Sequence, residues 1–216
     1  MSDARSSVLA RIRGALQDVP RDERPEDVPV AREYARAGGG RSRDEVLELF
    51  EDRVRDYHAA VRRVAAANVQ AAVDEACREM RLRSVAVPAD LALGWRPGLA
   101  EVVEDTGLTA RELDAIDGAL TGCAVAIAET GTLVLDGQGA SGRRLLTLVP
   151  DNHICVVSAE QVVESVPEAF ERVAPAVREH RRPITLVSGP SASSDIELTR
   201  VEGVHGPRNL LVLIAG

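Results

Sequence analysis

This 216-residue chain contains no lysine, so all 26 of its basic residues are arginines. Without lysine it cannot form a Schiff base with a carbonyl substrate, and it lacks the phosphate-binding lysine of a P-loop. The formal net charge is −8, and only 2% of the residues are aromatic. Nucleic acid is therefore not an expected partner, because phosphate binding needs clustered positive charge and single strands bind through stacked aromatic rings.

Cysteine is also scarce: Cys77, Cys123 and Cys155 lie far apart and form no CxxC pair. We predict no metal site and no iron–sulfur cluster held by this chain alone, because such sites use closely spaced ligands. No GxGxxG segment follows a predicted strand, so a nicotinamide or flavin fingerprint is missing. The cofactor, if any, stays unknown.

Long apolar runs are missing too. No segment approaches the roughly 20 residues that a membrane span needs. The first residues, "MSDARSSVLARIRGALQD", are mixed in charge and lack the apolar region of a secretory signal. These absences predict a cytoplasmic protein without a membrane span.

The first 40 residues differ in composition from the rest. Residues 4–17 have the spacing of a short amphipathic helix. Residues 18–40 combine three prolines, many charges and the run Gly38–Gly40, which is typical of an extended arm. We therefore predict an N-terminal helix and arm over residues 1–40 and a folded domain over 41–216.

Several segments of the domain have helical patterns. Ser42 and Glu45 form a capping box, and apolar residues recur every three or four positions from Val46 to Val64, which predicts one long helix. Three more segments are predicted helical: 69–81, "PGLAEVVEDTG" (97–107) and "TARELDAI" (109–116). A last helix is predicted over "EQVVESVPEAFERVAPAV" (160–177), kinked at Pro167, and a short strand over 84–88.

From Thr121 onward the pattern changes to continuous apolar runs. They are "CAVAIA", "TLVL", "HICVVS", "ITLVS" and "LLVLIAG". Such runs are typical of strands covered on both faces, and their alternation with helices predicts an α/β protein with an open, mostly parallel sheet flanked by helices. We expect residues 122–216 to form one such sheet.

Three polar clusters lie at or near the ends of these strands, where ligands bind in α/β proteins. The first is the turn Glu129–Thr132, the second is "SGPSASSDIE" (188–197), and the third is "GVHGPR" (203–208). We expect them to meet in one pocket. Glu129 and His205 are the predicted acid–base groups. The predicted anion-binding residues are Thr130, Gly131, Thr132, Arg143, Arg144, Ser191, Ser193, Ser194 and Asp195.

Structural roles account for the same residues equally well. Thr130 and Thr132 can close the turn by local hydrogen bonds, and the serines can belong to a surface turn. Arg143 and Arg144 can begin a solvated helix. His153 precedes a strand and can act as a base, although a single histidine is more often structural.

Three long segments together resemble the LUD-domain family over residues 41–216: "GCAVAIAETGTLVLD", "RRLLTLVPDNHICVV" and "SGPSASSDIELTRVEGVHGPR". The resemblance implies a fold similar to the sugar-phosphate isomerase and CoA-transferase group. It also implies a role in oxidising L-lactate to pyruvate with iron–sulfur partner proteins that carry the clusters. In the related CoA-transferases a glutamate in a comparable turn is the nucleophile, which draws attention to Glu129 at the level of the fold.

Other functions stay open. The chain can be a subunit of an L-lactate-oxidising system with a pocket for an anionic substrate or cofactor. It can instead be a stand-alone enzyme acting on a sugar phosphate, an acyl-CoA or a folate-like ligand. A third alternative is a scaffolding subunit with a vestigial pocket.

Overall fold

A computed structural model describes residues 2–20, 22–31, 33–193, 201–202 and 205–216. It divides the chain into two compact units, Met1–Tyr34 and Ala35–Gly216. In the first unit, α1 (Ser2–Ala15) lies where a helix was predicted over residues 4–17, and it exposes the apolar residues Val8, Leu9 and Ile12. Beyond α1, the described residues of this unit contain one 3-10 turn (Pro25–Asp27) and are otherwise irregular.

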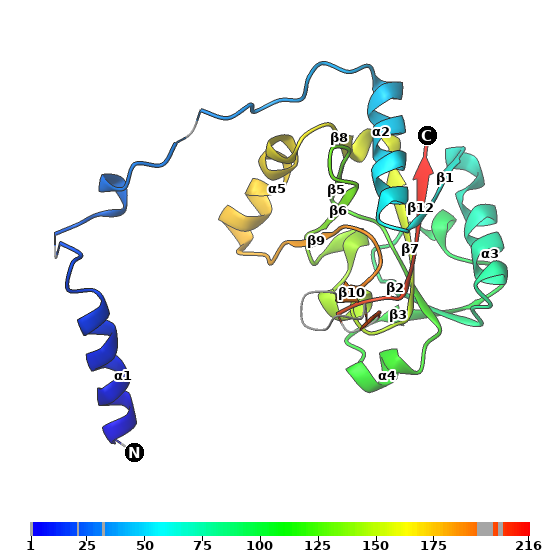
Figure 1. Cartoon of the computed structure of the whole chain (residues 1–216). Helices are drawn as coiled ribbons and strands as arrows, with labels where there is room; N and C mark the ends of the chain where they lie inside the picture. Colours follow the sequence, from blue (N-terminus) through cyan, green and yellow to red (C-terminus); the bar gives the residue numbers. More distant parts are fainter. Residues whose placement is uncertain (1, 21, 32, 194–200, 203–204) are drawn as a thin grey trace. The chain divides into compact units, whose positions relative to one another are not determined.

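The second unit is built on a six-stranded sheet (Figure 1). Its strands lie in the order β1 (Ala60–Val64), β12 (Asn209–Ala215), β7 (Asn152–Ser158), β4 (Gly118–Thr121), β2 (Ser84–Pro88) and β3 (Glu101–Asp105). All neighbouring strands in it are parallel. The predicted class, an α/β protein with a parallel sheet flanked by helices, is confirmed.

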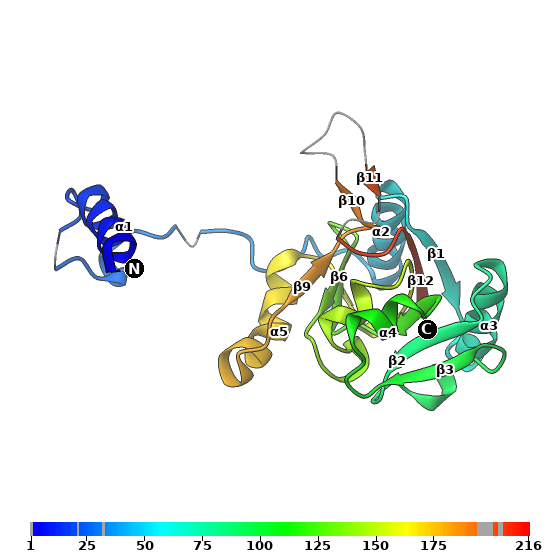
Figure 2. The same cartoon turned by 90° about the horizontal axis from the view of Figure 1, so that it is seen from below.

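Both faces of this sheet are covered, as the continuous apolar runs predict (Figures 1 and 2). On the central strands, residues alternate between the faces. Ile154, Val156, Leu211 and Leu213 belong to the core that includes α3 (Val69–Glu79). Cys155, Val157, Val212 and Ile214 belong to the core that includes α2 (Arg43–Asp56).

A second sheet has the order β8 (Val162–Val163), β5 (Val125–Ile127), β6 (Thr132–Leu135) and β9 (Thr185–Val187). Residues of its one face share a core with α2 and the large sheet, whereas its other face packs on α5 (Val166–His180). The expectation of one sheet over residues 122–216 is therefore wrong. A continuous apolar run indicates only that both faces of a strand are buried. The strands of the second sheet meet this condition because they lie between the large sheet and α5, so the runs do not show to which sheet a strand belongs.

A short antiparallel pair completes the described strands. β10 (Ala192–Ser193) pairs with β11 (Val201–Glu202).

The long helix predicted from Val46 to Val64 is wrong in its second half. α2 ends at Asp56, and the chain then enters strand β1. The end is a Schellman motif: the His58 N–H donates to the Arg55 carbonyl and the Ala59 N–H to the Val54 carbonyl. His58 takes the left-handed conformation (φ 63°) that glycine usually occupies, so the sequence gives no glycine signal for this helix end.

Two other predicted helices contain strands. Residues 101–105 of "PGLAEVVEDTG" form β3. In the segment 160–177, a 3-10 turn (Ala159–Gln161) and β8 precede α5, and Pro167 lies in the first turn of α5 rather than at a kink. At both helix starts the backbone N–H of a serine donates to a side chain three residues later, from Ser158 to Gln161 at 2.9 Å and from Ser165 to Glu168 at 3.1 Å. The helix predicted over 109–116 is confirmed as α4 (Ala110–Asp114), while β4 was not predicted.

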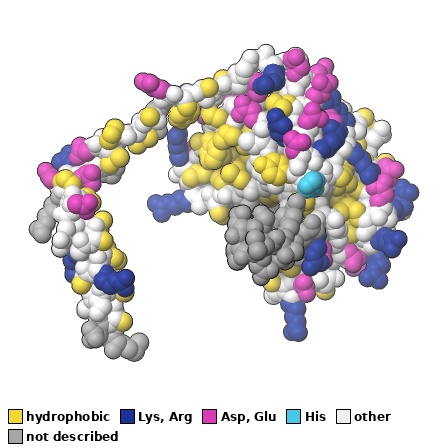
Figure 3. Space-filling view, in the orientation of Figure 1, with side chains coloured by type: hydrophobic (Ala, Val, Ile, Leu, Met, Phe, Trp, Pro, Cys, Tyr) yellow, Lys and Arg dark blue, Asp and Glu magenta, His cyan; other side chains and the backbone are white. Residues whose placement is uncertain are grey.

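Charged and hydrophobic side chains are distributed unevenly over the surface of the second unit (Figure 3). Charged side chains of both signs cover α2, whereas hydrophobic side chains gather over α5. Phe170 and Val177 of α5 and Leu186 of β9 are each about half exposed. Among the described residues, no helix is long and apolar enough to cross a bilayer.

Candidate functional site

The turn between β5 and β6 is closed by hydroxyl groups; we call Glu129–Thr132 with Ser188 the threonine turn. The Thr132 hydroxyl lies 2.7 Å from that of Thr130 and 2.8 Å from that of Ser188. Gly131 has a φ of 57°, and a Cβ there would lie 2.6 Å from the Arg53 carbonyl carbon of α2. The turn is therefore pressed against the end of α2, where only glycine fits.

Glu129 occupies the outer side of this turn. Its backbone N–H donates to the Glu164 carbonyl at 3.1 Å, which continues the pairing of β5 with β8. The residue is exposed, and its side chain makes no hydrogen bond within the described part of the chain. The predicted acid–base role of Glu129 stays a prediction.

The second and third polar clusters meet. The Ser191 N–H donates to the Pro207 carbonyl at 2.8 Å, and the Ser191 hydroxyl accepts the His205 N–H at 3.0 Å. Ser188, at the start of the second cluster, also contacts Thr132 of the first, so hydrogen bonds connect all three clusters. The predictions for Ser194 and Asp195, and for the side chain of Ser193, lie outside the described residues.

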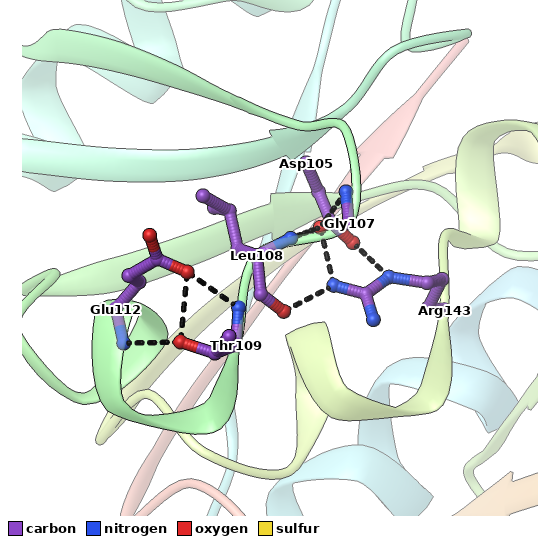
Figure 4. Close-up of polar contacts among 6 residues, drawn as sticks. All are labelled: Asp105, Gly107, Leu108, Thr109, Glu112 and Arg143. Carbon is purple, nitrogen blue, oxygen red and sulfur yellow. Dashed lines mark hydrogen bonds and ion pairs between the residues drawn. The ribbon is translucent and has the colours of Figure 1, made fainter.

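Arg143 and Arg144, the two arginines predicted to bind an anion, differ in their contacts. Arg143 is held by Asp105 at the end of β3: its Nε donates to one carboxylate oxygen at 2.7 Å and its Nη2 to the other (Figure 4). Nη2 also donates to the Leu108 carbonyl. The Asp105 side chain is only 2% exposed, and the Arg143 guanidinium is the main cause that holds the pKa of this carboxyl below its usual value. Arg143 thus already carries a bidentate carboxylate.

Arg144 has no such partner. Its Nη1 donates to the carbonyl and the hydroxyl of Thr147, at 2.9 and 3.0 Å, and its Nη2 to the His205 carbonyl at 3.3 Å. These acceptors are all uncharged, and no carboxylate within the described part of the chain forms an ion pair with Arg144. Partial burial lowers the pKa of this guanidinium from its usual value.

Arg144 lines a cavity of about 220 Å³, which we call the Arg144 cavity. The other walls come from the facing ends of β6 and β9, through Leu135 and Thr185, and from Pro183, Gly142 and Thr147. A Cβ on Gly142 would lie 2.8 Å from the Pro88 ring, so this segment runs close to the carboxyl end of β2. The cavity therefore lies near the sheet edge where α/β proteins bind ligands.

A buried histidine lies near the same arginine. The His153 ring is 1% exposed, and its Nε2 is 2.8 Å from the Thr121 hydroxyl. Its Nδ1 has no hydrogen-bond partner among the described residues. Burial, together with the positive charge of Arg144, lowers the pKa of His153 to about 4, so the ring is neutral at pH 7.

From the sequence, His153 is expected to be structural, as single histidines mostly are, and Thr121 and Thr147 are not among the predicted site residues. The available signal was a histidine at the start of the apolar run "HICVVS", two positions from a cysteine. Such a position predicts burial, but not the partner on β4.

The three cysteines are buried and free. Burial raises the pKa of Cys77 to about 11, with a smaller contribution from Asp74. Within the described ranges, no group of three or more histidine, cysteine or acidic side chains is arranged to hold a metal ion. The Arg144 cavity instead offers hydroxyls and a guanidinium, which bind anions.

Comparison with known proteins places these features in a family. The model of the LUD domain matches residues 41–215. "Lactate utilization protein C" of Deinococcus radiodurans is 51% identical over 176 residues, covering 81% of this chain and 82% of the relative. The protein of the same name from Shouchella clausii is 27% identical and covers 77% of each chain.

A solved structure agrees with the fold. The crystal structure of a DUF162 family protein from Deinococcus radiodurans is similar with a TM-score of 0.72 and 46% sequence identity. The similarity covers 82% of this chain and 99% of the other.

Proposed function

Because the chain belongs to the LUD domain family, we propose that it serves lactate utilization as a cytoplasmic subunit of a system that oxidises L-lactate to pyruvate. The observation that carries this proposal is the 51% identity to a relative named for lactate utilization, over most of both chains. Identity at this level over a whole domain makes a shared role the simplest expectation.

Oxidation of L-lactate to pyruvate removes two electrons and two protons from the substrate. We assign the electrons to iron–sulfur clusters of partner proteins, since the sequence of this chain has neither closely spaced cysteines nor a dinucleotide-binding motif. The part proposed for this chain is to hold an anion and to move a proton. Glu129 and His205 are the proposed acid–base groups, because both are exposed beside the connected polar clusters.

The test is growth of a strain of the source organism that lacks this chain. We expect the strain to fail on L-lactate as sole carbon source, to grow on pyruvate, and to recover with the wild-type chain. An affinity-tagged chain purified from lactate-grown cells should bring with it a protein that has iron–sulfur absorbance. Normal growth of the deletion strain on L-lactate would refute the proposal and leave the stand-alone enzyme as the alternative.

The acid–base groups are tested in the same strain. Glu129→Gln and His205→Gln remove the titrating atoms and keep the approximate side-chain shape, so we expect loss of growth on L-lactate with normal protein levels. Glu48→Gln, on the exposed side of α2, is the matched control and should grow normally. If one of these variants grows on L-lactate like the wild type, the residue that it replaces is not the acid–base group.

A further inference from the structure

We propose that the Arg144 cavity binds a small monoanionic carboxylic acid that carries a 2-hydroxy or 2-oxo group, with its carboxylate on the Nε–Nη2 edge of Arg144. The existence of this site is independent of the proposed function, and only the choice of L-lactate and pyruvate as probes rests on it. Three features of the cavity support the proposal.

The first feature is an available hydrogen-bonding edge. Nη1 of Arg144 is used by Thr147 and one Nη2 hydrogen by the His205 carbonyl. The Nε hydrogen and the second Nη2 hydrogen have no acceptor among the described residues. The neighbouring Arg143 uses this same pair of nitrogens to hold Asp105, which shows the geometry that a carboxylate takes on the edge.

The second feature is the charge. Two arginines line the cavity, but Asp105 neutralises Arg143, and His153 is uncharged at pH 7. One positive charge, that of Arg144, is left without a counter-charge in the described part of the site. A partly buried cation is costly unless it is paired, and a single negative charge restores neutrality. A monocarboxylate therefore fits better than a phosphate, which carries about 1.5 to 2 negative charges at pH 7.

The third feature is the lining. A volume of about 220 Å³ is small compared with the roughly 300–1,000 Å³ of pockets for drug-sized ligands, so it suits a small acid. Leu135 and Pro183 provide apolar walls for a short carbon chain. The Thr185 hydroxyl makes no hydrogen bond to the other described residues and can bind an oxygen at position 2 of the acid.

The experiment is isothermal titration of the purified full-length chain at low ionic strength. The probes are L-lactate, pyruvate, propanoate and inorganic phosphate. We expect saturable binding of L-lactate and pyruvate, weaker binding of propanoate, which lacks the 2-oxygen, and binding of phosphate at least about tenfold weaker. Absence of saturable binding by both 2-substituted acids, or tighter binding of phosphate, overturns the proposal. Propanoate binding as tight as that of L-lactate overturns the assignment of the 2-oxygen.

Arg144→Gln should weaken L-lactate binding at least about tenfold, because it removes the charge and the paired donors. Arg144→Lys keeps the charge without the planar edge and should give an intermediate affinity. Arg43→Gln is the matched control: desolvation also lowers the pKa of Arg43, which donates to a backbone carbonyl, that of Val162, but it lines another cleft. Unchanged affinity in both Arg144 variants overturns the proposal.

A footprint on the wild-type chain covers the case in which the variants fail to fold. Phenylglyoxal modifies accessible guanidinium groups, and peptide mass spectrometry reports each arginine. We expect L-lactate to protect Arg144 and to leave the modification of Arg43 unchanged; equal rates at Arg144 with and without L-lactate overturn the proposal. If the ligand binds while the deletion strain grows on L-lactate, the proposed function fails and the site stands.

Discussion

The threonine turn and the Arg144 cavity are both polar regions beside the apolar core, but they satisfy their polar groups differently. In the threonine turn, the hydroxyls of Thr130, Thr132 and Ser188 hydrogen-bond to one another. In the Arg144 cavity, a partly buried guanidinium contacts only uncharged acceptors among the described residues. Near this arginine, but not lining the cavity, the buried His153 has an Nδ1 without a partner among the described residues.

This difference indicates which kind of polar residue predicts a bound ligand. Buried polar groups are almost always hydrogen-bonded, so a closed hydroxyl network needs nothing from outside the protein. A buried charge without a counter-charge is costly, and a bound anion is one way to offset that cost. The richer sequence motif, "AETGT", thus lies at the more self-contained of the two regions.

The largest expected effect is at the tip of the threonine turn. Gly131→Ala should lower the free energy of unfolding by about 3 kcal/mol, because Gly131 has a left-handed backbone conformation and the added Cβ would overlap the Arg53 backbone. Gly139→Ala is the matched control: Gly139 has a φ of 53° and nothing within 4 Å of an added Cβ, so we expect about 1 kcal/mol. Urea unfolding measures both. Equal losses would show that the turn is not pressed against α2.

The next effect concerns the buried histidine. His153 binds a proton near pH 4 in the folded protein and near pH 6.5 when unfolded, so the unfolded state gains the proton first as the pH falls. Between pH 7 and pH 5 this should remove about 2 kcal/mol of stability. His153→Gln should abolish that part of the pH dependence, as measured by urea unfolding at both pH values.

The exposed His180 offers the control for this experiment. His180→Gln should leave the difference in unfolding free energy between pH 7 and pH 5 unchanged. If His153→Gln retains the wild-type difference, the ring is not held neutral by its surroundings, and the contrast between the two regions weakens.

The smallest effect tests the hydroxyl network. Thr132→Val keeps the shape of the side chain but removes its hydrogen bonds to Thr130 and Ser188, so we expect a loss of about 1 kcal/mol in unfolding free energy. Thr106→Val, in an exposed loop, should change stability by less than about 0.5 kcal/mol. A Thr132→Val variant as stable as the wild type would mean that the network does not stabilise the turn.

Much of the fold was predictable because burial leaves a pattern in the sequence. The strands β5, β6 and β9 lie within predicted apolar runs, β7 and β12 begin one residue before theirs, and the predicted capping box at Ser42 is present. The failures have local causes. His58 ends α2 without the usual glycine, and residues 101–105 form a strand because their backbone pairs with β2.

The candidate site was predictable only in part. The three polar clusters were recognised from residue types, and hydrogen bonds connect them in the fold. His153 and Thr121, by contrast, are 32 positions apart, and their contact follows from the pairing of β4 with β7. Pairing between distant strands leaves no local signal.

The sequence by itself determined that this is an α/β protein, which segments are buried, and which residue types gather at the loops. The tertiary structure decided the rest, as the adjacent Arg143 and Arg144 illustrate. Local sequence does not distinguish them, yet Asp105, 38 positions earlier, holds only Arg143. Burial is a property of each segment and leaves a periodic pattern, whereas the pairing of charges depends on which distant segments the folded chain brings together.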